Sequence, residues 1–244
     1  LVGFDSLFMH AMEIREIMQD VKEGVYGNRM NLGALAIGGC RYDIDAEVTG
    51  FMRGQLDKLK PLLSELTRVY ETDPLITKRT KGIGVLPLDK AREYEVVGPV
   101  ARASGIAYDV RRKAPYAVYP ELDFEVQTDT AGDVHSRAML RLREARESVY
   151  LLEQCLDTIP EGPIGQEGAV YVPEGEAVAR SEAPRGEVFY YVRSDGTDMP
   201  QRLKWRVPTC MSWEVIQVMM AGCQVADIPL IVNSIDPCIS CTER

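Results

Sequence analysis

The residues with the clearest chemical potential are two cysteines near the end of the chain, in Asp236-Pro237-Cys238-Ile239-Ser240-Cys241-Thr242-Glu243-Arg244. Two thiolates separated by two residues can converge on one soft metal ion or on a dinuclear centre, and Pro237 stiffens the backbone before them. The same spacing also fits a redox disulfide, half of a zinc site, or coincidence. A tetrahedral zinc site would need two more ligands, and the sequence has no second CxxC motif and no paired histidines. The spacing alone leaves these alternatives open.

A second candidate is an arginine between a proline and a glycine, in Glu182-Ala183-Pro184-Arg185-Gly186, directly before an expected strand. Proline restricts the backbone there, and glycine permits the close approach of another group. An arginine in this position can present a permanent cation to an anionic or metal-bound ligand. A simple surface turn is the competing interpretation.

Other polar residues are interpreted as structural. The remaining cysteines are expected to be small buried residues, and they are Cys40, Cys155, Cys210 and Cys223. Four arginines of a predicted long helix alternate with glutamates and are expected to form a solvated, ion-paired face; they are Arg137, Arg141, Arg143 and Arg146.

Composition excludes several classes of protein. The 244 residues are 45% hydrophobic and 27% charged, which indicates a globular chain with enough material for a core. The net charge of −9 disfavours nucleic-acid binding, because the basic footprint for phosphate backbones is missing. No stretch approaches the roughly 20 uninterrupted apolar residues that span a bilayer. The start, Leu1-Val2-Gly3-Phe4-Asp5, is not a signal peptide, and we interpret the chain as a fragment, a processed chain or half of a split subunit.

Helical periodicity dominates the pattern. Apolar spacing predicts a helix that begins at Asp5 or Ser6 and is closed by Gly24, and a second over 49–71 that Pro61 kinks or starts. The clearest helix runs for about six turns from Val134 to Leu156. A further helix is expected over 212–223.

The segment of about 169–208 differs, because its apolar residues alternate. Val188, Tyr190 and Val192 share one face, Ser194-Asp195-Gly196-Thr197 supplies a turn, and Leu203, Trp205 and Val207 alternate on the return, which predicts a β-hairpin. The expected fold is therefore mainly α, a multi-helical core with a small β-hairpin or α+β insertion near the C-terminal third, in a single domain over 1–244.

Five segments resemble one known family. They are Arg79-Thr80-Lys81-Gly82-Ile83-Gly84-Val85, Gly98-Pro99-Val100-Ala101-Arg102-Ala103-Ser104-Gly105, Tyr119-Pro120-Glu121-Leu122-Asp123-Phe124, Glu182-Ala183-Pro184-Arg185-Gly186-Glu187 and the terminal Asp236–Arg244 motif. Together they resemble the large subunit of nickel–iron hydrogenases, in the membrane-bound, energy-converting group related to the 49-kDa subunit of complex I. Relatives in complex I share the middle segments and have lost the cysteines, so Cys238 and Cys241 favour a hydrogenase.

The resemblance implies roles for individual residues. Cys238 would be a terminal nickel ligand, and Cys241 would bridge nickel and an iron that carries CO and cyanide ligands. Arg185 matches the arginine poised over the cluster, with Pro184 beside it, and Asp236 matches a neighbouring carboxylate. Pro208 and Thr209 match the pair that lines the cyanide ligands. The implied activity is reversible heterolytic cleavage of H₂, in which Cys238 or Arg185 accepts the proton.

Two departures qualify this resemblance. The family's other two metal cysteines lie in an N-terminal Arg-x-Cys-Gly-x-Cys motif that nothing here matches, so the remaining ligands are expected from a separate chain or segment. Many hydrogenases end their motif in a histidine that helps to hold Mg²⁺ or iron, whereas Arg244 cannot ligate a cation, which disfavours a third metal. A chain that stops at Arg244 would correspond to the product of a maturation endopeptidase.

The resemblance also implies partners and a place in the cell. Electrons would pass through iron–sulfur clusters on a small [4Fe–4S] subunit, with a ferredoxin-linked donor or acceptor. Antiporter-like membrane subunits would hold the complex on the cytoplasmic side of the cell membrane. Two other functions stay open: a 49-kDa-like subunit of complex I that binds quinone without nickel, and a non-catalytic scaffold.

Overall fold

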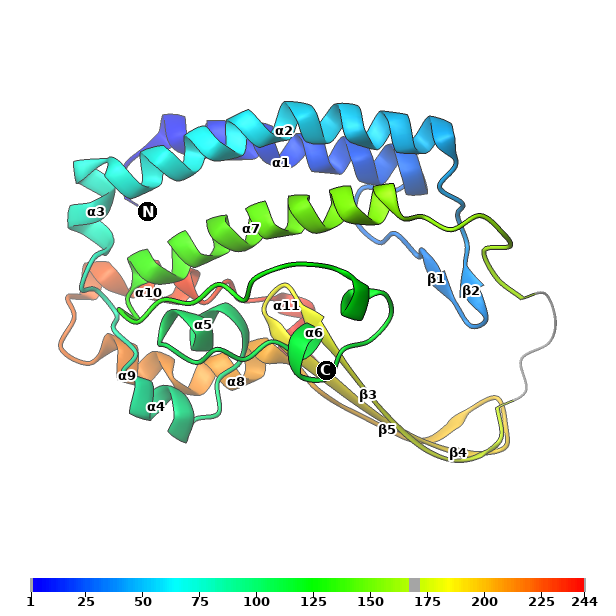
Figure 1. The fold of residues 1–244 in the computed structure, drawn as a ribbon. Helices are drawn as coiled ribbons and strands as arrows, with labels where there is room; N and C mark the ends of the chain where they lie inside the picture. Colours follow the sequence, from blue (N-terminus) through cyan, green and yellow to red (C-terminus); the bar gives the residue numbers. More distant parts are fainter. Residues whose placement is uncertain (1, 167–171, 244) are drawn as a thin grey trace. The chain divides into compact units, whose positions relative to one another are not determined.

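A computed structural model describes residues 2–166 and 172–243 (Figure 1). These residues group into two compact units. We call residues 3–69 and 146–166 the helical unit, and residues 2, 70–145 and 172–243 the site unit. The prediction that 1–244 form a single domain stays a prediction. Arg244, on which the expectations about a third metal and about maturation rested, lies outside the described residues.

The helical unit begins with helix α1 (Asp5–Tyr26), which ends where Gly27 adopts a left-handed conformation at φ +68°. The predicted end at Gly24 is wrong, because Gly24 lies inside α1 and faces helix α2 (Ala46–Thr72). A Cβ at Gly24 would meet Cε1 of Phe51 at 2.7 Å, so this glycine serves helix packing and does not terminate the helix. Two short strands, β1 (Leu35–Ala36) and β2 (Gly39–Cys40), lie between the helices.

Helix α2 buries one apolar stripe, formed by Met52, Leu56, Leu59 and Leu63. The helix begins at Ala46 and continues through Pro61, so the alternative that Pro61 marks its start is wrong. Lys60 Nζ lies 2.6 Å from Glu153 Oε1 on the last part of α7 (Val134–Asp157), which joins the two helices in this unit.

The site unit contains the first part of α7, a set of short helices and the sheet (Figure 1). The short elements are α3 (Pro74–Thr80), α4 (Leu88–Glu93), α5 (Gly98–Ala103), α6 (Val110–Lys113), η1 (Tyr119–Glu121), α8 (Pro208–Glu214), α9 (Ile216–Met220), η2 (Val225–Asp227), α10 (Ile228–Ser234) and α11 (Ile239–Thr242). Their apolar side chains form one buried cluster that includes Leu86, Val100, Val134, Val215, Met219 and Ile231. The predicted helix over 212–223 is wrong, because α8 and α9 share this region and α9 ends at Met220.

The sheet of the site unit has three antiparallel strands in the order β3 (Glu174–Ala183), β4 (Gly186–Asp195), β5 (Pro200–Arg206). Tyr190 pairs with Trp205 and Val192 with Leu203, which confirms the predicted hairpin. Strand β3 is an addition that the alternation did not reveal, and residues 169–171 of the expected insertion lie outside the described part. The observed fold is mainly helical with a small antiparallel sheet, as predicted.

The expectation of a solvated arginine face on α7 is wrong for two of its four members. The side chain of Arg137 is fully buried, and two nitrogens of Arg141 are also buried. The expectation that the scattered cysteines are buried is also wrong, because Cys40 is exposed and Cys155, Cys210 and Cys223 are half-buried. Among the described helices, none has the length and apolar character needed to cross a membrane.

Candidate functional site

The structure brings five of the predicted site residues together in the site unit. Arg185 lies in the turn between β3 and β4, Thr209 lies in the first turn of α8, and Asp236 follows α10. Cys238 precedes α11, and Cys241 lies within it. These elements are far apart in the sequence, so tertiary packing alone places a guanidinium, a carboxylate, a hydroxyl and two thiols in one region.

The Arg185 turn is fixed by a close contact between two backbones. A Cβ on Gly186 would lie 2.6 Å from the backbone nitrogen of Gly98, and a Cβ on Gly98 would lie 2.1 Å from the carbonyl oxygen of Arg185. Both glycines also have positive φ angles, +126° and +68°, which disfavour other residue types. The predicted role of glycine in permitting close approach is therefore confirmed, and the group that approaches is the first residue of α5.

Arg185 is bonded to Asp236 along one edge of its guanidinium. Nε donates to the backbone oxygen of Asp236 at 2.6 Å, and Nη2 donates to the carboxylate Oδ1 at 3.1 Å. Asp236 has a φ of +55°, a strained conformation for a residue other than glycine. The two bonds therefore fix both the side chain of Arg185 and the backbone that leads into the cysteine pair.

Helix α8 holds the cysteine segment through three hydrogen bonds. The backbone N–H of Cys238 donates to Thr209 Oγ1 at 3.3 Å, and the thiol of Cys210 donates to the carbonyl oxygen of Cys241 at 3.3 Å. Trp213 Nε1 donates to Thr242 Oγ1 at 3.1 Å. Thr209 is buried, which is consistent with a positioning role for its hydroxyl group. No signal in the sequence pointed to Cys210 or Trp213.

The two thiols differ in their environment. A hydrogen bond with Ser240 Oγ, 3.2 Å away, lowers the pKa of Cys238, and the nearby positive charge of Arg185 acts in the same direction. Burial is the largest influence on Cys241 and raises its pKa, and the neighbouring Cys238 raises it further. The cysteines are free thiols and lie near a cation, an environment that favours a thiolate and so a soft-metal ligand.

The donor set is incomplete for a metal centre. Within residues 2–166 and 172–243, no group of three or more His, Cys, Asp or Glu side chains is arranged to hold a metal ion. Cys238 and Cys241 therefore fit a soft metal as two of its ligands, and the others would have to come from outside the described residues. Pro184 precedes Arg185 in its turn, and Pro208 begins α8 beside Thr209. Their contact with ligands of an iron stays a prediction.

A buried charge cluster supports the Arg185 turn. Arg102, which is 2% exposed, donates from Nε to Glu144 Oε1 at 2.7 Å and from Nη1 to Glu182 Oε1 at 2.8 Å. Glu182 also accepts a bond from the backbone nitrogen of Val110 at 3.1 Å. Because Glu182 lies three residues before Arg185, this cluster anchors the strand that enters the turn. Sequence reasoning missed it, since Arg102 and its partners are 42 and 80 residues apart.

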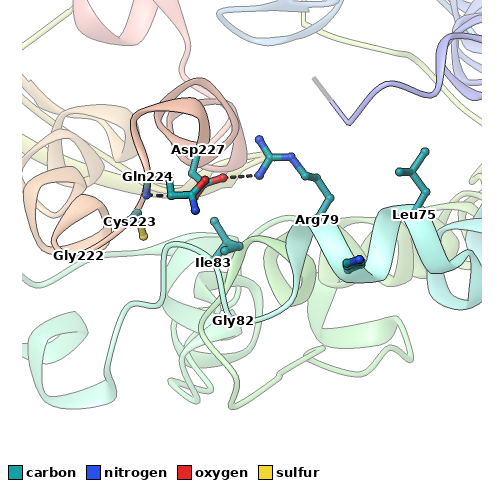
Figure 2. A pocket seen from close by; sticks show the side chains of 9 residues that line it. Leu75, Arg79, Gly82, Ile83, Gly222, Cys223, Gln224 and Asp227 are labelled. Carbon is teal, nitrogen blue, oxygen red and sulfur yellow. Dashed lines mark hydrogen bonds and ion pairs between the residues drawn. The ribbon is translucent and has the colours of Figure 1, made fainter.

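A separate cavity of about 710 Å³ lies between α3 and the segment before η2 (Figure 2). Figure 2 shows Arg79 reaching across it to Asp227, with which it forms an ion pair. Asp227 is buried and also accepts a hydrogen bond from the backbone nitrogen of Gln224 at 3.2 Å. The Arg79–Val85 segment of the family resemblance therefore contributes to this structural link between α3 and η2.

Comparison with known proteins identifies the family. The model of the respiratory-chain NADH dehydrogenase 49-kDa subunit matches residues 2–172 and 166–244, which together cover nearly the whole chain. The chain belongs to this family. It is 59% identical to the carbon monoxide-induced hydrogenase of Rhodospirillum rubrum over 245 residues, which cover 100% of this chain and 68% of that protein.

Two further relatives differ in name. A subunit of the F420H2 dehydrogenase of Methanosarcina mazei is 41% identical and is covered over 67% of its length, and all of this chain is aligned. The formate hydrogenlyase subunit 5 of Escherichia coli is 35% identical over 99% of this chain and 42% of its own length. This 49-kDa-family chain therefore spans about two thirds of its first relatives, and they include both hydrogenases and dehydrogenases.

Proposed function

We propose that this chain forms the C-terminal part of the catalytic subunit of a nickel–iron hydrogenase, which splits H₂ and reduces protons reversibly. The observation that carries the proposal is the placement of Cys238 and Cys241 beside the Arg185–Asp236 pair. Its support from the comparisons is the 59% identity to a protein named as a hydrogenase. In this proposal Cys238 is a terminal ligand of nickel and Cys241 bridges nickel and iron.

The bound centre would supply Lewis acidity and redox capacity for the splitting of H₂. The chain's own residues would orient it and handle the proton. Thr209 would lie beside the iron ligands, where its hydroxyl, with Pro208, could contact cyanide. The rigid Arg185 turn would keep a cation over the centre, and Asp236 would prevent that cation from turning away.

Two groups of this chain could take the proton released from H₂. One is the sulfur of Cys238, whose thiolate is favoured by Ser240 and by Arg185. The other is Arg185, whose deprotonation would weaken two hydrogen bonds with Asp236. The geometry therefore favours Cys238 as the acceptor and Arg185 as the group that stabilises the developing charge.

The proposal extends to the partners. We expect the remaining two cysteine ligands from a separate segment or chain, electron transfer through a small [4Fe–4S] subunit, and attachment to antiporter-like membrane subunits on the cytoplasmic side. A third metal such as Mg²⁺ is not part of the proposal.

The test is metal analysis of the purified complex with single serine variants. Cys238→Ser and Cys241→Ser should each lower nickel from about one per complex to a small fraction of that value, and should abolish H₂-dependent dye reduction. Cys223→Ser is the matched control, because this thiol lies at the separate cavity and donates to the carbonyl oxygen of Met219. Retention of nickel and activity in both variants would refute the proposal.

The second candidate is a quinone-site subunit that holds no nickel. It is supported by relatives named as NADH-quinone oxidoreductase subunits, such as that of Roseiflexus at 37% identity. In that case the native complex would contain no nickel, and both serine variants would reduce quinone at the rate of the unmodified protein.

A further inference from the structure

A second cavity of the site unit, of about 270 Å³, lies between α7 and the end of α10. Its lining is mostly apolar, with Arg141 and Asp236 as the charged members and Asn233, Ser234 and Tyr70 as polar ones. The volume exceeds the roughly 30 Å³ that one water molecule occupies in the liquid several-fold, so a small molecule or a side chain fits.

Arg141 carries an uncompensated edge. Its Nη1 donates to the carbonyl oxygen of Arg137 at 3.0 Å, whereas Nε and Nη2 are buried and have no hydrogen-bond partner. Two donors of a cation that are removed from water and left unpaired are unfavourable, so a partner that accepts from both would be bound strongly. Burial also lowers the pKa of Arg141, as expected for a cation without a close counter-ion.

The charged groups near Arg141 are already engaged elsewhere. Asp236 is bonded to Arg185, and Glu144 accepts a bond from Arg102 at 2.7 Å. Arg102 and Arg185 add positive charge to the surroundings of Arg141. A negatively charged occupant would therefore be attracted to this cavity in spite of Asp236.

The geometry of the unpaired edge selects the shape of that occupant. Nε and Nη2 form the side of a guanidinium that binds both oxygens of a carboxylate in parallel. The same chain shows this arrangement at Arg111, whose Nε and Nη2 donate to the two oxygens of Asp109 at 3.0 and 2.6 Å. Tyr70 offers a further donor, because burial raises the pKa of its phenol to about 12 and keeps it protonated.

We propose that this cavity is a carboxylate-binding site in which Arg141 receives both oxygens of a carboxylate group. The group is either a free small carboxylate, such as formate, or the side-chain carboxylate of a polypeptide segment outside this chain. This inference does not depend on the proposed hydrogenase activity.

Calorimetric titration of the purified complex with sodium formate, against sodium chloride at equal ionic strength, tests the first source. Binding in the millimolar range is expected, at least tenfold weaker in Arg141→Gln and within twofold of the original in Arg143→Gln. Arg143 is the matched control because it lies on the same helix, is 37% exposed, and does not line this cavity.

A density map of the unmodified complex tests the second source without any variant. A side-chain carboxylate seated against Nε and Nη2 of Arg141, together with an absence of formate binding, supports a polypeptide donor. A cavity that holds only water in the map, and no formate binding by the complex, would overturn the proposal.

Discussion

Gly98 and Gly186 cross so closely that neither can carry a side chain, and this crossing sets the position of Arg185. The backbone of α5 thus acts as the support for the turn that carries the guanidinium. Because the contact is between two backbones, no side-chain rearrangement can relieve a substitution at either glycine.

Gly98→Ala should therefore damage the site unit. We expect the free energy of unfolding to fall by about 2 kcal/mol or more, through overlap with the Arg185 carbonyl and strain at positive φ. Gly54→Ala is the control, because nothing lies within 4 Å of its added Cβ in α2, and it should leave stability unchanged or raise it by up to about 1 kcal/mol. Denaturant unfolding measures both, and equal effects would contradict this account.

Arg185→Lys should lower H₂-dependent dye reduction by about tenfold to a hundredfold, since an ammonium cannot make both bonds to Asp236 in the guanidinium geometry. The nickel content should stay the same, because the thiol ligands are untouched. Arg193→Lys in β4 is the control, as this arginine is 53% exposed and its nearest carboxylate oxygen is 3.7 Å away. An activity equal to that of the control would exclude a role for the paired geometry.

Arg137→Met should lower the free energy of unfolding by about 3 kcal/mol, although methionine fits a buried position. The guanidinium donates to the carbonyl oxygens of Gly132 at 2.6 Å and Gly84 at 2.9 Å, and to Ser234 Oγ at 2.9 Å. Removing it leaves these acceptors unpaired. Arg143→Met, at a more exposed position, should change stability by no more than about 0.5 kcal/mol, and a similar loss in both variants would contradict the prediction.

His135 should make stability depend on pH in the acid direction. Burial and Lys81 lower the pKa of His135 in the folded chain below its usual 6.5, and Thr80 Oγ1 lies 3.0 Å from Nδ1. The unfolded chain therefore binds more protons near pH 6, so stability is fully present above pH 6.5 and declines as the pH falls through the lowered pKa. Melting temperatures between pH 5 and 7.5 should show this slope in the original chain and a smaller one in His135→Gln. An unchanged slope in the variant would assign the effect to another group.

Local patterns predicted the long helices and the hairpin because their causes are local. The spacing of apolar residues from Val134 to Leu156 indicates a helix whatever it packs against, and the helix found spans Val134–Asp157. The limits were wrong where packing decided them. Gly24 resembles a helix terminator, but Phe51 of α2 packs against it, and the helix continues to Tyr26.

Charge patterns were a poorer guide than apolar spacing. Alternating Arg and Glu on α7 indicated a solvated face, yet Arg137 is buried among carbonyl oxygens and Arg141 faces a cavity. A buried arginine is recognised only when its partners are known, and those of Arg137 lie as far along the chain as Ser234.

The sequence by itself determined the chemical groups of the site: two thiols at fixed spacing, an arginine between proline and glycine, and the segments that resemble the family. Only the tertiary structure decided that Arg185 bonds to Asp236 and that α8 supports the cysteine turn. The physical reason is that hydrogen bonds between residues 29 or 51 positions apart depend on how the whole site unit packs. The unpaired edge of Arg141 was likewise undetectable in the sequence, because burial and lack of a partner are properties of the fold.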